Sequence, residues 1–234
     1  MRSKGLFTLS VVLLSACWLL SVPAVMASTF PDFNNTSFWE QTIVGTGISV
    51  DVVNNNTLDV TLSKNLTPVG NYYSGGLTTK VPVTGNFDYQ VNYNLLNWPI
   101  TGGPNGVRLT IGFGDAAAGV GGGVERVSWE YTWSEVYLTD FHGFPYNYIP
   151  TTDTSGTLRI ARTGNTVTGS YWSGSDWVVI ESYTYSTLGP ITFALAAGGP
   201  YDSFRPHGQD VKVEFTVKYT GRAPLAALDL LLLN

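Results

Sequence analysis

The stretch Ser155–Tyr183, SGTLRIARTGNTVTGSYWSGSDWVVIESY, constrains the fold more than any other part of the chain. It predicts three short strands joined by tight turns, over Thr157–Arg162, Thr166–Trp172 and Trp177–Tyr183. The two joints, Thr163-Gly164-Asn165 and Ser173-Gly174-Ser175-Asp176, supply the Gly, Asn and Asp residues that accept the positive φ of a hairpin turn. Such a regular meander predicts an antiparallel sandwich or barrel.

The same period-two alternation of apolar and polar residues recurs along the chain. Phe87–Leu95, Val107–Phe113 and Val211–Tyr219 each place apolar side chains on one face of a half-buried strand. Further strands are expected at Ile48–Val53, Leu58–Leu62, Leu77–Val83, Val127–Trp133, Glu135–Phe141 and Ile191–Ala197. We therefore predict an all-β fold, a two-sheet antiparallel β-sandwich. Its core is expected to contain Phe87, Val91, Leu109, Ile111, Val213 and Phe215.

Residues 1–27 have the pattern of a signal peptide. Arg2 and Lys4 precede an apolar run over Leu6–Leu20, and Val25-Met26-Ala27 forms a small-residue cleavage site. This run is too short for a transmembrane span, which needs about 20 apolar residues. We expect a signal peptide over 1–27, a β-sandwich domain over 28–220 and an apolar C-terminal tail over 221–234.

The predicted location is therefore secreted or at the cell surface. Leu14-Ser15-Ala16-Cys17 resembles a bacterial lipobox, which leaves lipoprotein anchoring through Cys17 open. The apolar residues that follow Cys17 argue against it, because a lipoprotein normally turns polar there. Cys17 is the only cysteine, so a chain cleaved after Ala27 has no disulfide and no cysteine-based nucleophile or zinc site.

Charge is scarce along the whole sequence. Charged residues make up 12% of the chain and the net charge is −5, with no basic block. Nucleic acid is therefore not an expected partner, because phosphate neutralisation needs clustered Lys and Arg. Gly, Tyr, Trp, Thr and Asn fill the space that charges leave, as in many exported β-sheet proteins that handle neutral sugars.

Three segments carry a resemblance to a known superfamily. They are GNFDYQVNYNLLNWP (Gly85–Pro99), NGVRLTIGF (Asn105–Phe113) and the meander that begins at Ser155. Together they are similar to the concanavalin A-like lectin/glucanase sandwich domains, which implies a jelly roll. Members of this superfamily bind carbohydrates, hydrolyse or eliminate them, or act as adhesive modules. The resemblance does not choose among these functions.

Catalytic signatures are weak. Glycosidases need two carboxyl groups close together, and glucanases on this fold often carry an E-x-D-x-x-E strand, which this chain lacks. Glu125, Glu130 and Glu135 are spaced by five, so neighbours in this series face opposite ways on an unbroken strand. A lyase would need a base such as His142. We predict a protein that is not an enzyme, with Glu130 and His142 as the catalytic candidates if it is one.

Aromatic and polar residues on strand faces and in turns favour glycan binding. Flat rings stack on pyranose faces, while amide and guanidinium groups bond to hydroxyls. The expected ligand-binding residues are Gln90, Asn92, Trp98, Arg108, Glu130, Tyr146, Tyr148 and Trp172. We expect Gln90, Arg108 and Glu130 to meet in one cleft beside an exposed Trp or Tyr. The predicted function is that of an exported, non-catalytic, lectin-like protein whose partner is a polysaccharide or other glycan.

Two other functions remain open on the sequence. One is a structural or adhesive surface protein without a small ligand, which would self-associate. The other is a polysaccharide-active glycoside hydrolase or lyase. No cofactor is required by any of these, although a structural calcium ion is a further hypothesis. Its candidate ligands are Asp32, Glu40 and Asp210, which lie near the two ends of the domain.

Overall fold

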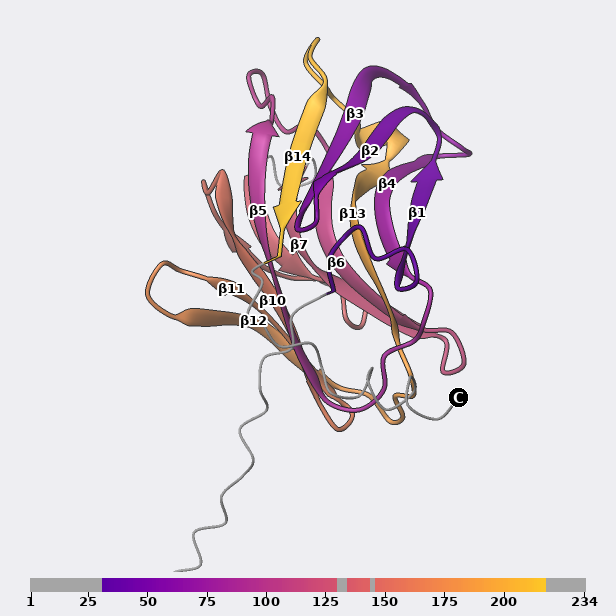
Figure 1. The fold of residues 1–234 in the computed structure, drawn as a ribbon. Coiled ribbons are helices and arrows are strands. Elements are labelled where there is room, and N and C mark those ends of the chain that lie inside the picture. Colours follow the sequence, from indigo (N-terminus) through magenta and orange to yellow (C-terminus); the bar gives the residue numbers. More distant parts are fainter. Residues whose placement is uncertain (1–30, 130–133, 144–145, 218–234) are drawn as a thin grey trace, which may run out of the picture.

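Two antiparallel sheets of seven strands each pack face to face (Figure 1). The computed structural model describes residues 31–129, 134–143 and 146–217. Within these ranges the only helical element is a 3-10 turn, η1 (Tyr201–Ser203). The prediction of an all-β, two-sheet antiparallel sandwich is confirmed. Strand order in both sheets departs from chain order, because distant segments pair with one another.

The first sheet, called sheet A, has the order β1-β4-β13-β6-β7-β8-β9. Its strands are β1 (Trp39–Val44), β4 (Tyr72–Thr79), β13 (Thr192–Pro200), β6 (Arg108–Asp115), β7 (Val120–Trp129), β8 (Ser134–Thr139) and β9 (Asn147–Pro150).

The second sheet, called sheet B, has the order β12-β11-β10-β5-β14-β3-β2. Its strands are β12 (Trp177–Thr184), β11 (Thr166–Trp172), β10 (Ser155–Thr163), β5 (Phe87–Asn97), β14 (Val211–Thr216), β3 (Thr57–Thr67) and β2 (Thr46–Asn54).

The meander predicted from Ser155 onward is present as β10, β11 and β12. Gly164 and Gly174 in its two turns have φ of 61° and 98°, so each turn places glycine in the left-handed region where a side chain would be strained. The β11–β12 hairpin lies at the edge of sheet B and projects to the left in Figure 1.

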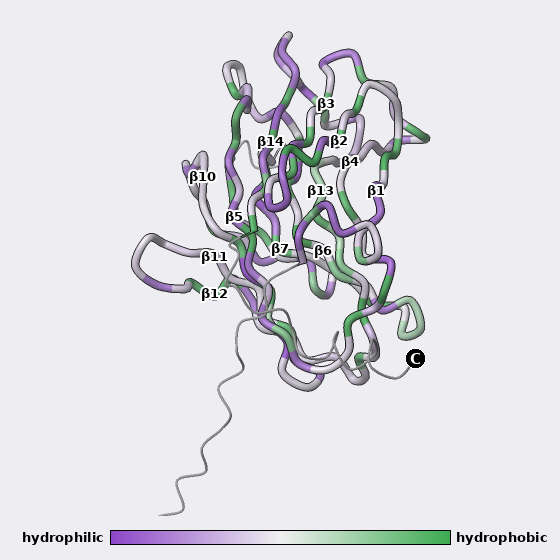
Figure 2. Tube along the Cα trace, in the orientation of Figure 1, coloured by the Kyte–Doolittle hydropathy of each residue, from purple (hydrophilic) through white to green (hydrophobic). Residues whose placement is uncertain are grey.

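A single apolar core fills the space between the sheets. Hydrophobic and hydrophilic residues alternate in short steps along the strands (Figure 2), and the apolar set faces inward. All six residues expected in the core belong to it: Phe87, Val91, Leu109, Ile111, Val213 and Phe215.

A smaller apolar cluster lies on the outer face of sheet A. It consists of Val127, Trp129, Val136 and Leu138, with Tyr146 packed against it. These side chains face outward, because Val124 on the same strand faces the main core. We call this group the outer cluster. Tyr146, which precedes β9, therefore packs against an apolar surface.

Some predictions fall outside the described ranges. The signal peptide at 1–27, the tail at 221–234 and Glu130 lie outside the described residues and stay predictions. In the part of the chain that is described, no helix has the length and apolar character needed to cross a membrane.

Candidate binding site on sheet A

Small residues on β13 create a hollow on the outer face of sheet A. Ala194, Ala196 and Gly198 lie on the outer face of β13, where two methyl groups and a glycine leave space above the sheet. The larger side chains of the neighbouring strands surround this space and enclose a pocket of about 460 Å³.

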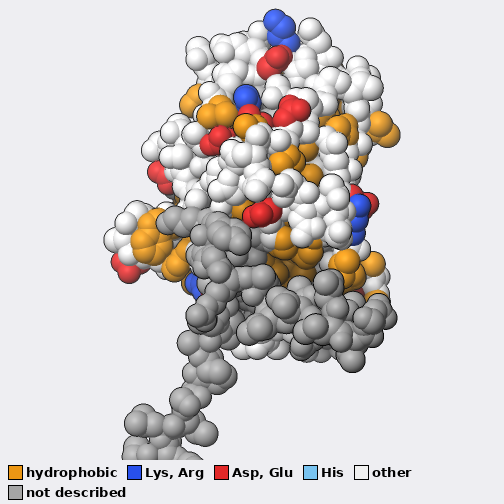
Figure 3. All heavy atoms as spheres, viewed as in Figure 1, with side chains coloured by type: hydrophobic (Ala, Val, Ile, Leu, Met, Phe, Trp, Pro, Cys, Tyr) orange, Lys and Arg blue, Asp and Glu red, His pale blue; other side chains and the backbone are white. Residues whose placement is uncertain are grey.

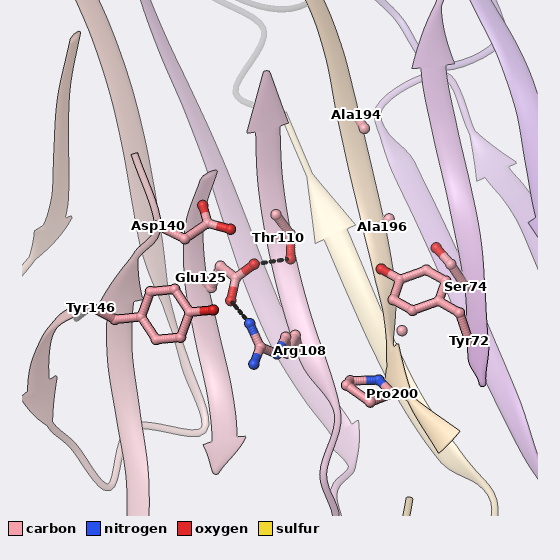
Figure 4. Close-up of a pocket in the computed structure, with 11 residues that line it drawn as sticks. Tyr72, Ser74, Arg108, Thr110, Glu125, Asp140, Tyr146, Ala194, Ala196 and Pro200 are labelled. Carbon is pink, nitrogen blue, oxygen red and sulfur yellow. Dashed lines mark hydrogen bonds and ion pairs between the residues drawn. The ribbon is translucent and has the colours of Figure 1, made fainter. Parts of the chain in front are cut away.

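The pocket floor is polar. Register pairs Thr110 of β6 with Glu125 of β7, so both side chains stand side by side on the outer face. Thr110 Oγ1 donates to Glu125 Oε1 at 3.1 Å, and Arg108 Nη1 lies 3.3 Å from Glu125 Oε2. Figure 4 shows these three groups together, with the Asp140 carboxylate pointing into the same hollow.

Two tyrosines flank this floor. Tyr72 at the start of β4 and Tyr146 before β9 lie on opposite sides of the pocket (Figure 4). Tyr146 rests on Trp129 of the outer cluster, with ring centroids 6.3 Å apart, and the Arg108 guanidinium lies 6.0 Å from the Tyr146 ring. The last contact is within the range of a cation–π interaction. Contacts with Trp129 and with Arg108 therefore fix the position of the Tyr146 ring.

Burial controls the ionisation of the floor. Glu125 is 5% exposed, and its pKa is raised to about 7, mainly by burial, with Arg108 opposing the shift and the Asp140 charge adding to it. Burial also raises the pKa of Asp140, against the effect of its hydrogen bond from the Gly123 backbone N–H. Near neutral pH the pocket therefore contains a carboxyl group that can either donate or accept a hydrogen bond.

The predicted binding residues are divided between the two sheets. Arg108 and Tyr146 line the sheet A pocket, whereas Gln90, Asn92 and Trp172 line a different hollow on the outer face of sheet B. The prediction that Gln90 and Arg108 share one cleft is wrong. Both point outward as expected, but from opposite faces of the sandwich.

Two of the predicted aromatic binding residues, Trp98 and Tyr148, line neither the sheet A pocket nor the sheet B hollow. Trp98 packs against the core instead of standing on the surface: its indole N–H donates to Glu135 Oε2 at 2.9 Å, and Arg126 lies 5.9 Å from its ring. Tyr148 is 46% exposed and meets Trp129 edge to face at 5.1 Å, beside the outer cluster.

The second catalytic candidate connects the two sheets. His142 Nε2 lies 2.8 Å from Glu181 Oε1, and Thr139 Oγ1 donates to the other oxygen of the same carboxylate at 2.7 Å. Thr139 is on β8 of sheet A and Glu181 on β12 of sheet B. His142 does not line the sheet A pocket or the sheet B hollow.

The calcium candidates are not gathered into a site. Asp210 accepts a hydrogen bond from the Lys64 backbone N–H at 2.8 Å, and Glu40 is exposed on β1. The backbone carbonyl of Asp32 accepts a hydrogen bond from the Asn35 backbone N–H. Among the described residues, no group of three or more His, Cys, Asp or Glu side chains could hold a metal ion.

Of the residues that line the pocket, sequence reasoning predicted only Arg108 and Tyr146 as binding residues, and it missed Glu125, Asp140 and Tyr72 among others. A signal for Glu125 was present, because Glu125-x-Val127-x-x-Glu130 has the glutamate spacing of the E-x-D-x-x-E strand, with valine in place of the aspartate. Asp140 follows β8 and meets Glu125 only through the pairing of β7 with β8. Tyr72 gave no signal in the sequence.

The fold and the pocket together define a sandwich with a polar hollow of about 460 Å³ on one outer face. Neither a protein-family model nor a curated protein matches the sequence. Solved structures do match. A Bacillus licheniformis β-glucanase is 12% identical with a TM-score of 0.55, over 84% of this chain and 100% of the glucanase.

Two further solved structures match the fold of this chain. A prokaryotic β-1,3-1,4-glucanase (lichenase) from a mouse hindgut metagenome is 11% identical, with a TM-score of 0.55, over 80% of this chain and 94% of its own. A legume lectin-like domain from Entamoeba histolytica is 13% identical, with a TM-score of 0.50, over 79% of this chain and 91% of its own. The chain therefore shares its two-sheet sandwich fold with these two glucanases and with the lectin-like domain. At these identities the likeness concerns the fold alone.

Proposed function

We propose that this chain is a carbohydrate-binding protein that holds a glycan in the sheet A pocket. The observation that carries the proposal is the combination of a polar floor, Arg108–Glu125–Asp140, in which Glu125 is buried, with tyrosines on two sides. Sugars present hydroxyl groups at their edges and C–H groups on their faces. A pocket that offers hydrogen-bond partners below and flat rings at the sides matches both.

The charge of the pocket favours a neutral glycan. Two carboxyl groups and one guanidinium line it, so an anionic sugar would meet more negative than positive charge. Its volume of about 460 Å³ lies in the range typical of small-molecule sites and is large enough for sugar rings. Export through the predicted signal at 1–27 would bring the protein to polysaccharides outside the cell.

A second candidate function is glycoside hydrolysis, and the pairing of Glu125 with Asp140 favours it. A glycosidase needs one carboxylic acid that keeps its proton near neutral pH and a second carboxylate nearby. With a pKa of about 7, Glu125 has the ionisation expected of such an acid. Asp140, which also points into the pocket, would be its partner.

Binding assays on the full chain test the first proposal. The protein is applied to an array of neutral polysaccharides, together with variants Arg108→Ala and Tyr146→Ala, which remove one floor group and one side of the pocket. Each is expected to weaken binding at least about tenfold, as is usual for central contact residues. Glu40→Gln, on the exposed face of β1, is the control and should bind as the parent chain does.

Three outcomes are decisive. Binding by the parent chain that both variants retain would refute the sheet A pocket as the site. Self-association without any glycan binding would replace the proposal with the adhesive function. Release of new reducing ends that stops in Glu125→Gln would favour the hydrolase.

A further inference from the structure

A row of side chains crosses the outer face of sheet B. Register pairs Trp177 of β12 with Trp172 of β11, and Thr157 of β10 with Asn92 of β5. Leu158 pairs with Tyr171, which places Thr157 beside Trp172. These four residues therefore form one continuous line across four adjacent strands, which we call the tryptophan row. At about 4.8 Å between strands, it spans roughly 14 Å.

The row lines a shallow hollow of about 290 Å³, to which Gln90 also contributes. The two indole rings lie with centroids 5.4 Å apart at an angle of 67°, and Trp172 is 37% exposed. Hydrophobic side chains gather over the β11–β12 hairpin at the left of Figure 3, on a face whose other side chains are mostly uncharged. Trp172 is exposed and Trp177 is half-buried beside it, and apolar side chains grouped at a surface in this way mark interaction sites.

The polar partners of the row are held in fixed positions. Thr157 Oγ1 donates to Asn92 Oδ1 at 2.8 Å, which sets the orientation of that amide. Both carboxylate oxygens of Asp88 accept from one edge of the Arg159 guanidinium, with Nε–Oδ1 at 2.7 Å and Nη2–Oδ2 at 2.6 Å.

This ion pair also braces the row. The Arg159 guanidinium lies 5.2 Å from the Trp177 ring, so it supports the indole while its own charge is neutralised by Asp88. The surface is therefore largely organised before a ligand arrives, which reduces the entropy lost on binding. Because the charges of Arg159 and Asp88 offset each other, this pair gives the surface no net charge that would attract an ionic ligand.

We propose that the tryptophan row is a second carbohydrate site, one that binds an extended neutral polysaccharide chain. The indoles of Trp172 and Trp177 would stack on the C–H faces of successive sugar rings. Gln90, Asn92 and Thr157 would bond to the hydroxyl groups. The length of the row, roughly 14 Å, suits several linked sugars.

The two sites face away from each other. The sheet A pocket and the tryptophan row lie on opposite outer faces of the sandwich, separated by the core. One sugar ring cannot occupy both, so a protein with two occupied sites links two polysaccharide segments. This cross-linking consequence rests on the proposed function of sheet A, whereas the tryptophan row itself does not.

The test is affinity electrophoresis of the full chain in gels that contain barley mixed-linkage β-glucan, laminarin, xyloglucan or galactomannan. Trp172→Ala and Trp177→Ala are each expected to weaken binding at least about tenfold. Trp172→Phe keeps a flat ring and should retain most of the affinity. Val53→Ala removes exposed apolar atoms at the opposite edge of the same sheet, where Val53 is 59% exposed, and serves as the control.

Comparison with Arg108→Ala separates the two sites. Loss of binding in the tryptophan variants, with the melting temperature unchanged, supports the row whatever Arg108→Ala does. If Arg108→Ala abolishes binding and the tryptophan variants bind normally, the row is refuted and the sheet A proposal stands. If none of the four polysaccharides retards the parent chain, both proposals fail. Turbidity with β-glucan that needs both sites intact would support cross-linking.

Discussion

The buried Glu125 makes the stability of the protein depend on pH in a defined direction. In the folded chain its pKa is about 7, against an ordinary value of 4.5 in the unfolded chain. Between these values the folded state binds more protons than the unfolded state, so the contribution of this group to stability is lost as the pH rises. Below pH 4.5 the group is protonated in both states and adds no penalty.

The size of the effect follows from the difference between the two pKa values. It corresponds to about 3 kcal/mol of destabilisation well above pH 7, of which roughly 2–3 kcal/mol develops between pH 5 and pH 8. Glu125→Gln removes the titrating group while keeping an oxygen that can accept from Arg108. We therefore expect this variant to gain stability relative to the parent chain as the pH increases.

Urea unfolding at pH 5 and pH 8 measures this gain. The difference in unfolding free energy between Glu125→Gln and the parent should grow by roughly 2–3 kcal/mol from the lower pH to the higher. Glu40→Gln, an exposed carboxylate changed in the same way, should show almost no such growth. A difference that stays constant with pH, or that shrinks, would refute the argument that Glu125 is buried against its charge.

Two further predictions concern packing. Gly169→Ala should lower the unfolding free energy by about 1–3 kcal/mol, because an added Cβ would lie 2.7 Å from Thr139 Cγ2 and 2.8 Å from Val124 Cγ2. Urea titration measures this loss, and Gly112→Ala is the control in the same titration, because its added Cβ would meet nothing nearer than 3.6 Å. His142→Ala should cost about 1 kcal/mol, because it removes the contact with the buried Glu181. The same variant should leave glycan affinity unchanged in the electrophoretic assay, and a large loss of affinity would contradict the placement of His142 outside both binding sites.

Much of the fold could be predicted from local patterns. The alternation in Phe87–Leu95 divides the side chains of that strand into an apolar set and a polar set. The apolar set is the one found in the core. The glycines at 164 and 174 mark turns because positive φ is a property of single residues. Trp98 shows the limit of this reasoning: its sequence position predicts a ligand-binding residue, but Glu135 and Arg126 contact it from strands distant in the sequence.

The site depended on information that alternation does not carry. Period two separates inward from outward side chains, but a sandwich has two outer faces, and only strand pairing assigns a residue to one of them. Gln90 and Arg108 both point outward, yet β5 belongs to sheet B and β6 to sheet A. Likewise, Glu125 and Asp140 share a pocket because β7 pairs with β8, and the shift in the Glu125 pKa follows from that burial.

The sequence by itself determined the strands, their turns and the scarcity of charge, since these depend on single residues and near neighbours. The tertiary structure decided which polar groups meet, because a shared pocket is a property of contacts between strands far apart in the chain.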